Sequence, residues 1–158
     1  MQETRTTFTL RPGRADDWPA LLDLYAAAYA AQPEYGEADE AHARRYLRWL
    51  QRHHTFFQVA EDEAGRRVGF IVVDADWRDR QGRPVGEIHE LVVHPAHWGH
   101  GLGGQLLEAG LAHIRARGLR RAGLWVGEKN DRARAFYERH GFRAVGQGGF
   151  WVRMEKSW

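Results

Sequence analysis

The sequence contains no cysteine among its 158 residues, which excludes disulfides, thiolate metal sites and a cysteine nucleophile. No apolar run approaches the roughly 18 residues that a membrane-spanning helix needs. The first residues, MQETRTTFTLRPG, lack the apolar core of a signal peptide. Lysine is also scarce, since Lys129 and Lys156 are the only two. These absences predict a cytoplasmic protein that does not contact a membrane.

Charge is balanced along the chain rather than concentrated. The 23 basic residues oppose 21 acidic ones, and the formal net charge is +2. Arginines often stand near Asp or Glu, as in DWRDR and EKNDRARAFYER. Because a nucleic-acid-binding protein usually carries a basic arm or patch, we expect no nucleic acid among the partners.

The pattern of apolar residues predicts one mixed α/β domain over residues 1–158. Hydrophobic residues make up 43% of the chain, which is enough for a sizeable core. Apolar spacing predicts strands over 6–11, 55–62, 67–77, 85–93, 121–127, 143–146 and 150–156. It predicts helices over about 17–31, 38–53, 103–117 and 131–140. The expected order is β-αα-βββ-α-β-α-ββ, with an antiparallel hairpin early and a βαβ unit later.

A glycine-rich loop lies between a predicted strand and a predicted helix, in the stretch ELVVHPAHWGHGLGGQLLEAG. Such loops let the backbone approach a phosphate. A P-loop is excluded because Gln105 and Leu106 follow the last glycine instead of Lys-Ser or Lys-Thr. A dinucleotide fingerprint is formally present in Gly99, Gly101 and Gly104. The dinucleotide interpretation is disfavoured because the five residues HPAHW separate the glycines from the strand. A predicted hairpin also precedes that strand, whereas a dinucleotide-binding unit comes first in an alternating βαβ series.

The same stretch resembles the acyl-CoA pyrophosphate loop of the GCN5-related N-acetyltransferase (GNAT) family. The family pattern is roughly V-x-P-x-x-(R/Q)-G-x-G-(I/L)-G-x-x-L-L, and the matching residues are Val93, Pro95, Gly99, Gly101, Leu102, Gly103, Leu106 and Leu107. Trp98 departs from the pattern, because it stands where Arg or Gln is usual. Main-chain N–H groups and the helix N-terminus do most of the work in such a loop, so the resemblance holds.

A second match begins 26 residues after Gly104, where NDRARAFYERHGF resembles the family segment N-x-x-A-x-x-F-Y-x-x-x-G-F. Two motifs in the family's order imply an acyltransferase that uses acetyl-CoA as cosubstrate and acetylates an amine. The resemblance implies these residues for binding acetyl-CoA: Leu91, Val92, Val93, Trp98, Gly99, His100, Gly101, Leu102, Gly103, Gly104, Asn130, Ala133 and Phe136.

The base is predicted from the strand that precedes the loop. Many family members carry a glutamate six positions before the Val that ends this strand, and Glu87 falls there. We predict that Glu87 acts through a water, because a carboxylate of ordinary pKa is a weak base. Strand alternation puts Glu87, His89, Leu91 and Val93 on one face. Glu90 faces the other side unless a bulge brings it to the substrate as a second catalytic carboxylate.

Tyr137 is the predicted acid. A phenol has a pKa of about 10, so it can protonate a departing thiolate at neutral pH. Main-chain N–H groups around Leu91 to Val93 are expected to polarise the thioester carbonyl. Neighbouring strands must separate there to admit the pantetheine arm, which can then hydrogen-bond like an added strand.

The acceptor is predicted from the segment between the first two helices. This segment combines aromatic and acidic residues, which suits a cation: Tyr29, Tyr35, Glu34, Glu37, Asp39 and Glu40. We expect a polyamine-like, aminoglycoside-like or amino-acid-like small amine, contacted by Tyr29, Tyr35 and His89. A peptide N-terminus or protein lysine is the alternative acceptor. A non-catalytic acyl-CoA-binding module is the alternative of a different class.

Four histidines cluster within twelve residues, at 89, 94, 97 and 100. We expect no metal, because a glycine loop holds ligands poorly and no carboxylate has a suitable spacing within it.

Trp77, Phe150 and Trp151 are expected to be exposed, and two roles stay open for them: a homodimer interface or a cover over the acceptor.

Overall fold

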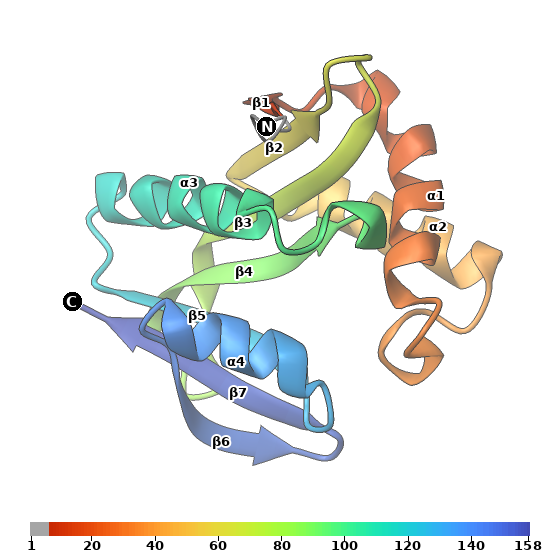
Figure 1. The fold of residues 1–158 in the computed structure, drawn as a ribbon. Helices are drawn as coiled ribbons and strands as arrows, with labels where there is room; N and C mark the ends of the chain where they lie inside the picture. Colours follow the sequence, from red (N-terminus) through yellow and green to blue (C-terminus); the bar gives the residue numbers. More distant parts are fainter. Residues whose placement is uncertain (1–6) are drawn as a thin grey trace, which may run out of the picture.

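A computed structural model of the chain describes residues 7–158, which form a mixed α/β fold of seven strands and four α-helices (Figure 1). The order agrees with the predicted β-αα-βββ-α-β-α-ββ. The elements are β1 Thr9–Pro12, α1 Trp18–Tyr29, α2 Glu40–Arg52, β2 Phe56–Glu61, β3 Arg67–Arg78, β4 Pro84–Val93, α3 Leu102–Ala116, β5 Arg121–Gly127, α4 Asp131–Arg139, β6 Arg143–Gly148 and β7 Trp151–Ser157. Thr6, in the predicted first strand, lies outside the described residues.

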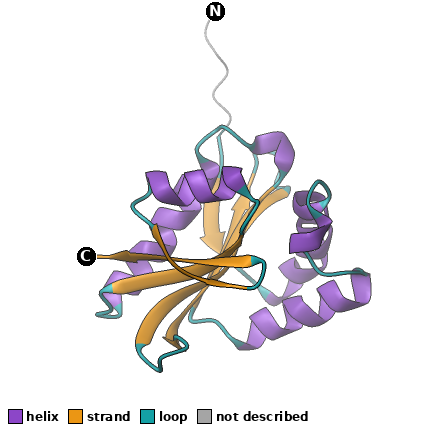
Figure 2. Cartoon of the chain, turned by 90° about the horizontal axis from the view of Figure 1, so that it is seen from below, coloured by secondary structure: helices purple, strands orange, loops and turns teal. Residues whose placement is uncertain are grey.

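The strands form one sheet in the order β1-β2-β3-β4-β5-β7-β6. Every neighbouring pair is antiparallel except β4 and β5, which are parallel and joined by the crossover helix α3. The predicted early hairpin and later βαβ unit are therefore confirmed. Helices cover both faces of the sheet, with α1 and α2 on one side and α3 and α4 on the other (Figures 1 and 2).

Two apolar cores hold these layers together, one on each face of the sheet. Along β3, Ile71 and Val73 pack towards α3, whereas Phe70 and Val72 pack towards α1 and α2. This alternation follows from the two-residue period of a strand, and it explains why β3 is buried along most of its length.

Local sequence fixes the ends of several helices. Gly118 and Gly141 follow α3 and α4 with φ of 79° and 89°, a backbone that favours glycine. Asn130 caps α4 through its side chain. Asp17 stands at the N-cap of α1 without a side-chain capping bond, because its buried carboxylate accepts hydrogen bonds from Arg11 and Arg67.

Candidate active site

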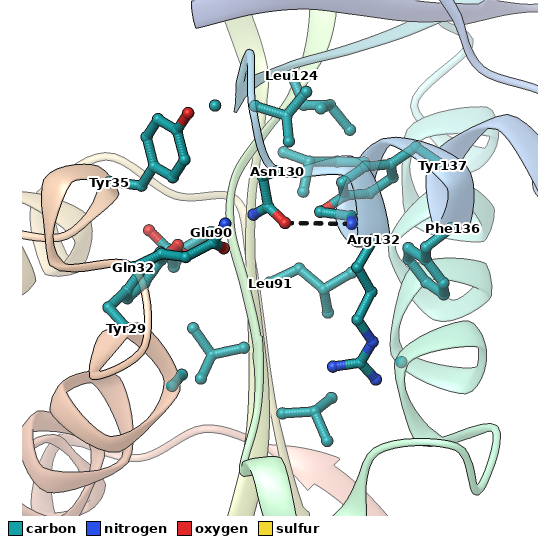
Figure 3. Close-up of a pocket in the computed structure, with 18 of the residues that line it drawn as sticks. Tyr29, Gln32, Tyr35, Glu90, Leu91, Leu124, Asn130, Arg132, Phe136 and Tyr137 are labelled. Carbon is teal, nitrogen blue, oxygen red and sulfur yellow. Dashed lines mark hydrogen bonds between the residues drawn. The ribbon is translucent and has the colours of Figure 1, made fainter. Parts of the chain in front are cut away.

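A cavity of about 1190 Å³ opens where β4 and β5 separate (Figure 3). The two strands pair only at Gly86↔Ala122 and Glu87↔Gly123. The other edge of β4 pairs with β3 from Pro84 to Val93. Residues 88–93 of β4 line the cavity. This stretch contains Leu91, Val92 and Val93, and it presents a strand edge that β5 leaves open.

The glycine-rich loop lines one part of this cavity. Gly99 and Gly101 have φ of 83° and 79°, and a Cβ on either would meet nothing within 4 Å. Their backbone conformation, rather than crowding, therefore requires glycine. Leu102 and Gly103 begin α3 and also line the cavity, whereas His100 and Gly104 do not. First-turn N–H groups of a helix have no intrahelical acceptor and attract anions.

Trp98 has a defined role in the loop. Its indole N–H donates to the main-chain oxygen of Val93 at 2.8 Å, which ties the loop to the end of β4. The guanidinium carbon of Arg132, from the first turn of α4, lies 3.6 Å from the centre of the Trp98 ring. Both side chains line the cavity. A cation therefore lies at the loop, although it comes from α4 rather than from position 98.

The second sequence motif lines the cavity from α4. Asn130, Ala133 and Phe136 all contribute to its wall, and Asn130 Oδ1 accepts a hydrogen bond from the Ala133 N–H at 3.3 Å (Figure 3). The ring of Phe136 packs beside Gly103, where an added Cβ would lie 3.4 Å from it. The two motifs, separate in the sequence, thus meet at one cavity.

Glu90 is a buried carboxylate on the cavity wall, with 8% of its surface exposed. The hydroxyl of Tyr29 donates to Oε1 at 2.6 Å, and that of Tyr46 donates to Oε2 at 2.7 Å. Burial raises the pKa of Glu90 to about 7, although both hydrogen bonds favour the charged form. A carboxylate with this pKa can exchange protons with a substrate at neutral pH.

A β-bulge sets the direction of Glu90. Val72 pairs with Glu90 and Val73 with Ile88, so His89 is an extra residue in β4. His89 packs against a tryptophan of α2, and Glu90 bonds a tyrosine of the same helix. Strict alternation is therefore wrong beyond Ile88, because His89 and Glu90 share one side of the sheet. Leu91 and Val93 pack instead against the core beneath α3.

Glu87 has different surroundings. Both of its carboxylate oxygens accept hydrogen bonds from Arg153 Nη1 on β7 at 2.6 Å. Glu87 is 3% exposed and does not line the cavity. Gly123 leaves room for this ion pair, since a Cβ there would lie 2.1 Å from Arg153 Nη2. The structure thus does not bring the predicted base into the cavity with Tyr137.

Tyr137 lies on α4 and lines the cavity, with 9% of its surface exposed. Burial raises the pKa of its phenol well above the ordinary value, and the nearby negative charge of Glu90 adds to the rise. The phenol therefore stays protonated at neutral pH. Glu90 and Tyr137 approach the cavity from opposite walls (Figure 3).

The predicted acceptor residues Tyr29, Tyr35 and His89 all line the cavity. The hydroxyl of Tyr35 accepts a hydrogen bond from the Lys129 N–H at 2.9 Å, which links the α1–α2 segment to the start of α4. Of the acidic residues in that segment, only Glu37 lines the cavity. Asp39 caps α2 and Glu40 pairs with an arginine, while Glu34 is exposed.

The three large aromatics differ in environment. Trp77 is partly buried against His89 and Trp49, which corrects its expected exposure. Trp151 packs on Tyr35 and lines the cavity, whereas Phe150 is 74% exposed. Of the two predicted roles, a cover over the acceptor agrees with the position of Trp151 at the cavity. The homodimer interface stays a prediction.

Sequence reasoning missed several cavity residues: Tyr25, Tyr46, Arg80 and Trp125. Tyr46 falls on the apolar side of its predicted helix, so its spacing alone indicates packing rather than binding. Within residues 7–158 no three His, Asp or Glu side chains gather as a metal site would require, and the absence of a metal stays a prediction. No helix in this part of the chain is long and apolar enough to cross a bilayer.

Comparison with known proteins supports the resemblance in the sequence. The chain matches the acetyltransferase (GNAT) family over residues 18–142. It is 37% identical to an uncharacterized N-acetyltransferase of Methanocaldococcus jannaschii, over 95% of this chain and 67% of that protein.

Solved structures share the fold. A protein of Pyrococcus horikoshii is 36% identical, with a TM-score of 0.86 over 96% of this chain and 99% of the other. The PaiA N-acetyltransferase of Thermoplasma acidophilum, solved with coenzyme A, is 20% identical with a TM-score of 0.76, over 96% and 99% of the two chains. The fold, the two motifs and these relatives together establish that the chain belongs to the GNAT family of acetyltransferases and is an acyltransferase.

Proposed function

We propose that residues 1–158 form one acetyl-CoA-dependent N-acetyltransferase domain, in which a primary amine attacks the acetyl group directly in a ternary complex. The observation that carries this proposal is the cavity between β4 and β5. It brings a buried carboxylate with a pKa of about 7, Glu90, and a protonated phenol, Tyr137, to opposite walls of one site.

Glu90 is the proposed base. An alkylammonium has a pKa of about 10 and must lose a proton before its nitrogen can attack. Glu90 accepts this proton, directly or through a water, and the hydroxyls of Tyr29 and Tyr46 fix the direction of its oxygens. Glu87 is not proposed as the base, because Arg153 occupies both of its oxygens.

The remaining steps involve the open edge of β4 and α4. Acetyl-CoA supplies the acetyl group as an activated thioester. Main-chain N–H groups around Leu91 to Val93 donate to the carbonyl oxygen while negative charge develops on it. Tyr137 donates its proton to the departing sulfur as the bond from sulfur to the acetyl carbon breaks.

The residues present fit acetyl-CoA. Space is open at the missing Cβ atoms of Gly99 and Gly101, and the first turn of α3 offers free N–H groups for phosphates. Arg132, stacked on Trp98, adds a positive charge at the same loop. The edge of β4 that β5 leaves open can pair with the amides of the pantetheine arm.

The proposed acceptor is a small cationic amine, because Glu90 and Glu37 both line the cavity near aromatic rings. Release of free thiol from acetyl-CoA, measured across amines and peptides, tests the function. Transfer to small amines supports it, and faster transfer to peptides would favour the alternative acceptor. Tight binding of acetyl-CoA with no transfer would indicate the non-catalytic binding module.

Replacement of Tyr137 by phenylalanine is expected to lower kcat about 10²-fold, because the departing sulfur loses its proton donor. The Michaelis constant for acetyl-CoA should change little, since the ring and its packing are kept. Steady-state thiol release measures both constants, with thermal melting as the control for folding. A variant that folds, binds acetyl-CoA and turns over at the wild-type rate would remove this role.

Replacement of Trp98 by alanine is expected to raise the Michaelis constant for acetyl-CoA about 5-fold, because Arg132 loses the ring that holds it. Replacement of Arg132 by glutamine should give a similar rise. The double variant should be no worse than the worse single variant, since both changes remove one arrangement. Arg120→Gln, at an exposed site outside the cavity, is the matched control. Additive effects in the double variant would contradict the pairing.

A further inference from the structure

Arg80 lines the cavity from the loop between β3 and β4. Its guanidinium carbon lies 4.6 Å from the centre of the Trp125 ring. The guanidinium also lies against Gly148, where a Cβ would come within 3.1 Å of Arg80 Nη1. The Trp125 ring and the space left by Gly148 therefore hold the Arg80 guanidinium in one orientation.

The loop that carries Arg80 is itself held in place. Asp79 Oδ1 accepts hydrogen bonds from the N–H groups of Gln81 and Arg83, each at 2.9 Å. Asp79 Oδ2 forms an ion pair with Arg121 at 2.7 Å. These contacts fix the backbone on both sides of Arg80, so its side chain starts from a defined position.

Arg80 has no acidic partner among residues 7–158, and its guanidinium donates no hydrogen bond within that part of the chain. Its neighbours differ: Arg78 donates to the Gly82 carbonyl, while Arg83 and Arg121 pair with Asp79. Arg153, the other guanidinium near Trp125, is neutralised by Glu87. The exposed guanidinium of Arg80 thus lines the cavity without a protein partner among the described residues, and it is free to bind a ligand.

Arg80 stacks on Trp125, which lies on the same face of the sheet as the proposed base and lines the same cavity. Leu124 and Val126 pack into the core beneath α3, so strand alternation turns Trp125 to the opposite face of β5. Glu90 lies on that same face, where it bonds tyrosines of α1 and α2. Trp125, His89 and Glu90 all line the cavity. A small molecule whose amine reaches Glu90 can therefore reach Arg80 with a second group.

We propose that the acceptor carries a carboxylate as well as its amine, and that Arg80 binds this carboxylate; the inference rests on the proposed N-acetyltransferase function. The planar guanidinium matches a carboxylate with two parallel hydrogen bonds. Polyamines and unmodified aminoglycosides have no such group. Of the three acceptor types expected from the sequence, Arg80 thus selects the amino-acid-like one.

Matched acceptors test this assignment, because lysine and cadaverine, or phenylalanine and phenethylamine, differ only by a carboxylate. Wild-type kcat/KM, measured by thiol release, is expected to be at least about 10-fold higher for the carboxylated member of a pair. Arg80→Gln should lower kcat/KM for that member about 10- to 100-fold and leave the other member within about twofold. Arg143→Gln, an exposed arginine outside the cavity, should change neither.

The outcomes separate the inference from the function on which it rests. A wild-type preference for the decarboxylated member, or an equal loss for both members in Arg80→Gln, would overturn the carboxylate assignment alone. Faster transfer to a peptide amide than to the free amino acid would overturn it too. Acetyl-CoA binding without transfer to any acceptor would overturn the proposed function, and the inference with it.

Discussion

Replacement of Glu90 by glutamine is expected to lower kcat about 10²- to 10⁴-fold. In the wild type, the rate should rise as the pH passes through about 7, because only the ionised Glu90 can accept a proton from the acceptor. The glutamine variant should lose this inflection. Thiol release measured from pH 5.5 to 9 tests both effects. Two acceptors with different amine pKa values separate the ionisation of Glu90 from that of the acceptor.

Glu87→Gln is the matched control for Glu90→Gln. Because the Glu87 carboxylate lies outside the cavity, this variant should keep the inflection near pH 7. The reverse pattern, with the inflection kept in Glu90→Gln and lost in Glu87→Gln, would return the base to Glu87.

Unfolding of the Glu90 variant provides a second control. The raised pKa means that folded protein holds the Glu90 proton to higher pH than the unfolded chain does. Ionisation of Glu90 therefore lowers wild-type stability progressively between pH 4.5 and 7. Glu90→Gln lacks this loss and should gain on the order of 1 to 3 kcal/mol relative to the wild type between pH 5 and 8. Its lower activity would then not reflect unfolding.

Replacement of Arg153 by methionine is expected to lower the free energy of unfolding by about 3 to 5 kcal/mol. The change leaves the Glu87 carboxylate buried without the guanidinium that now bonds both of its oxygens. The loss should be larger at pH 8 than at pH 5, because an unpaired buried carboxyl can be protonated at the lower pH. Urea-induced unfolding at the two pH values measures the difference.

The double variant Glu87→Leu, Arg153→Met tests the cause of this loss. Removing both charges should recover most of the stability, since apolar residues of similar volume often replace a buried ion pair without loss. A double variant as unstable as Arg153→Met would show that other contacts of Arg153, such as the one to Glu155, carry the effect.

The fold was predictable from the sequence because its signals are local. β4 was expected over 85–93 and spans Pro84–Val93. Its ends could be predicted because Pro84 and Pro95 lie on either side of the run. The part of the site that is proposed to hold acetyl-CoA was predictable too. Its glycine loop and the Asn130 to Phe142 segment are each contiguous, so their patterns can be recognised without knowing the packing.

The acceptor side was less predictable because its residues come together only in the folded chain. Tyr46, Arg80 and Trp125 belong to three separate segments, and none has a local signal for binding. The choice between the two glutamates depends on a one-residue bulge at His89. It also depends on an arginine that lies 66 residues beyond Glu87. Neither follows from strand periodicity.

β4 and β5 share only two residue pairs, whereas β3–β4 and β5–β7 pair along most of their length. The middle of the sheet therefore has fewer backbone hydrogen bonds between its strands. Such a gap favours local opening, during which proteases reach a chain. A cosubstrate seated along the gap would oppose opening by about 2.7 kcal/mol at one hundred times its dissociation constant. The lifetime of the protein in a cell would then follow the supply of its acyl donor.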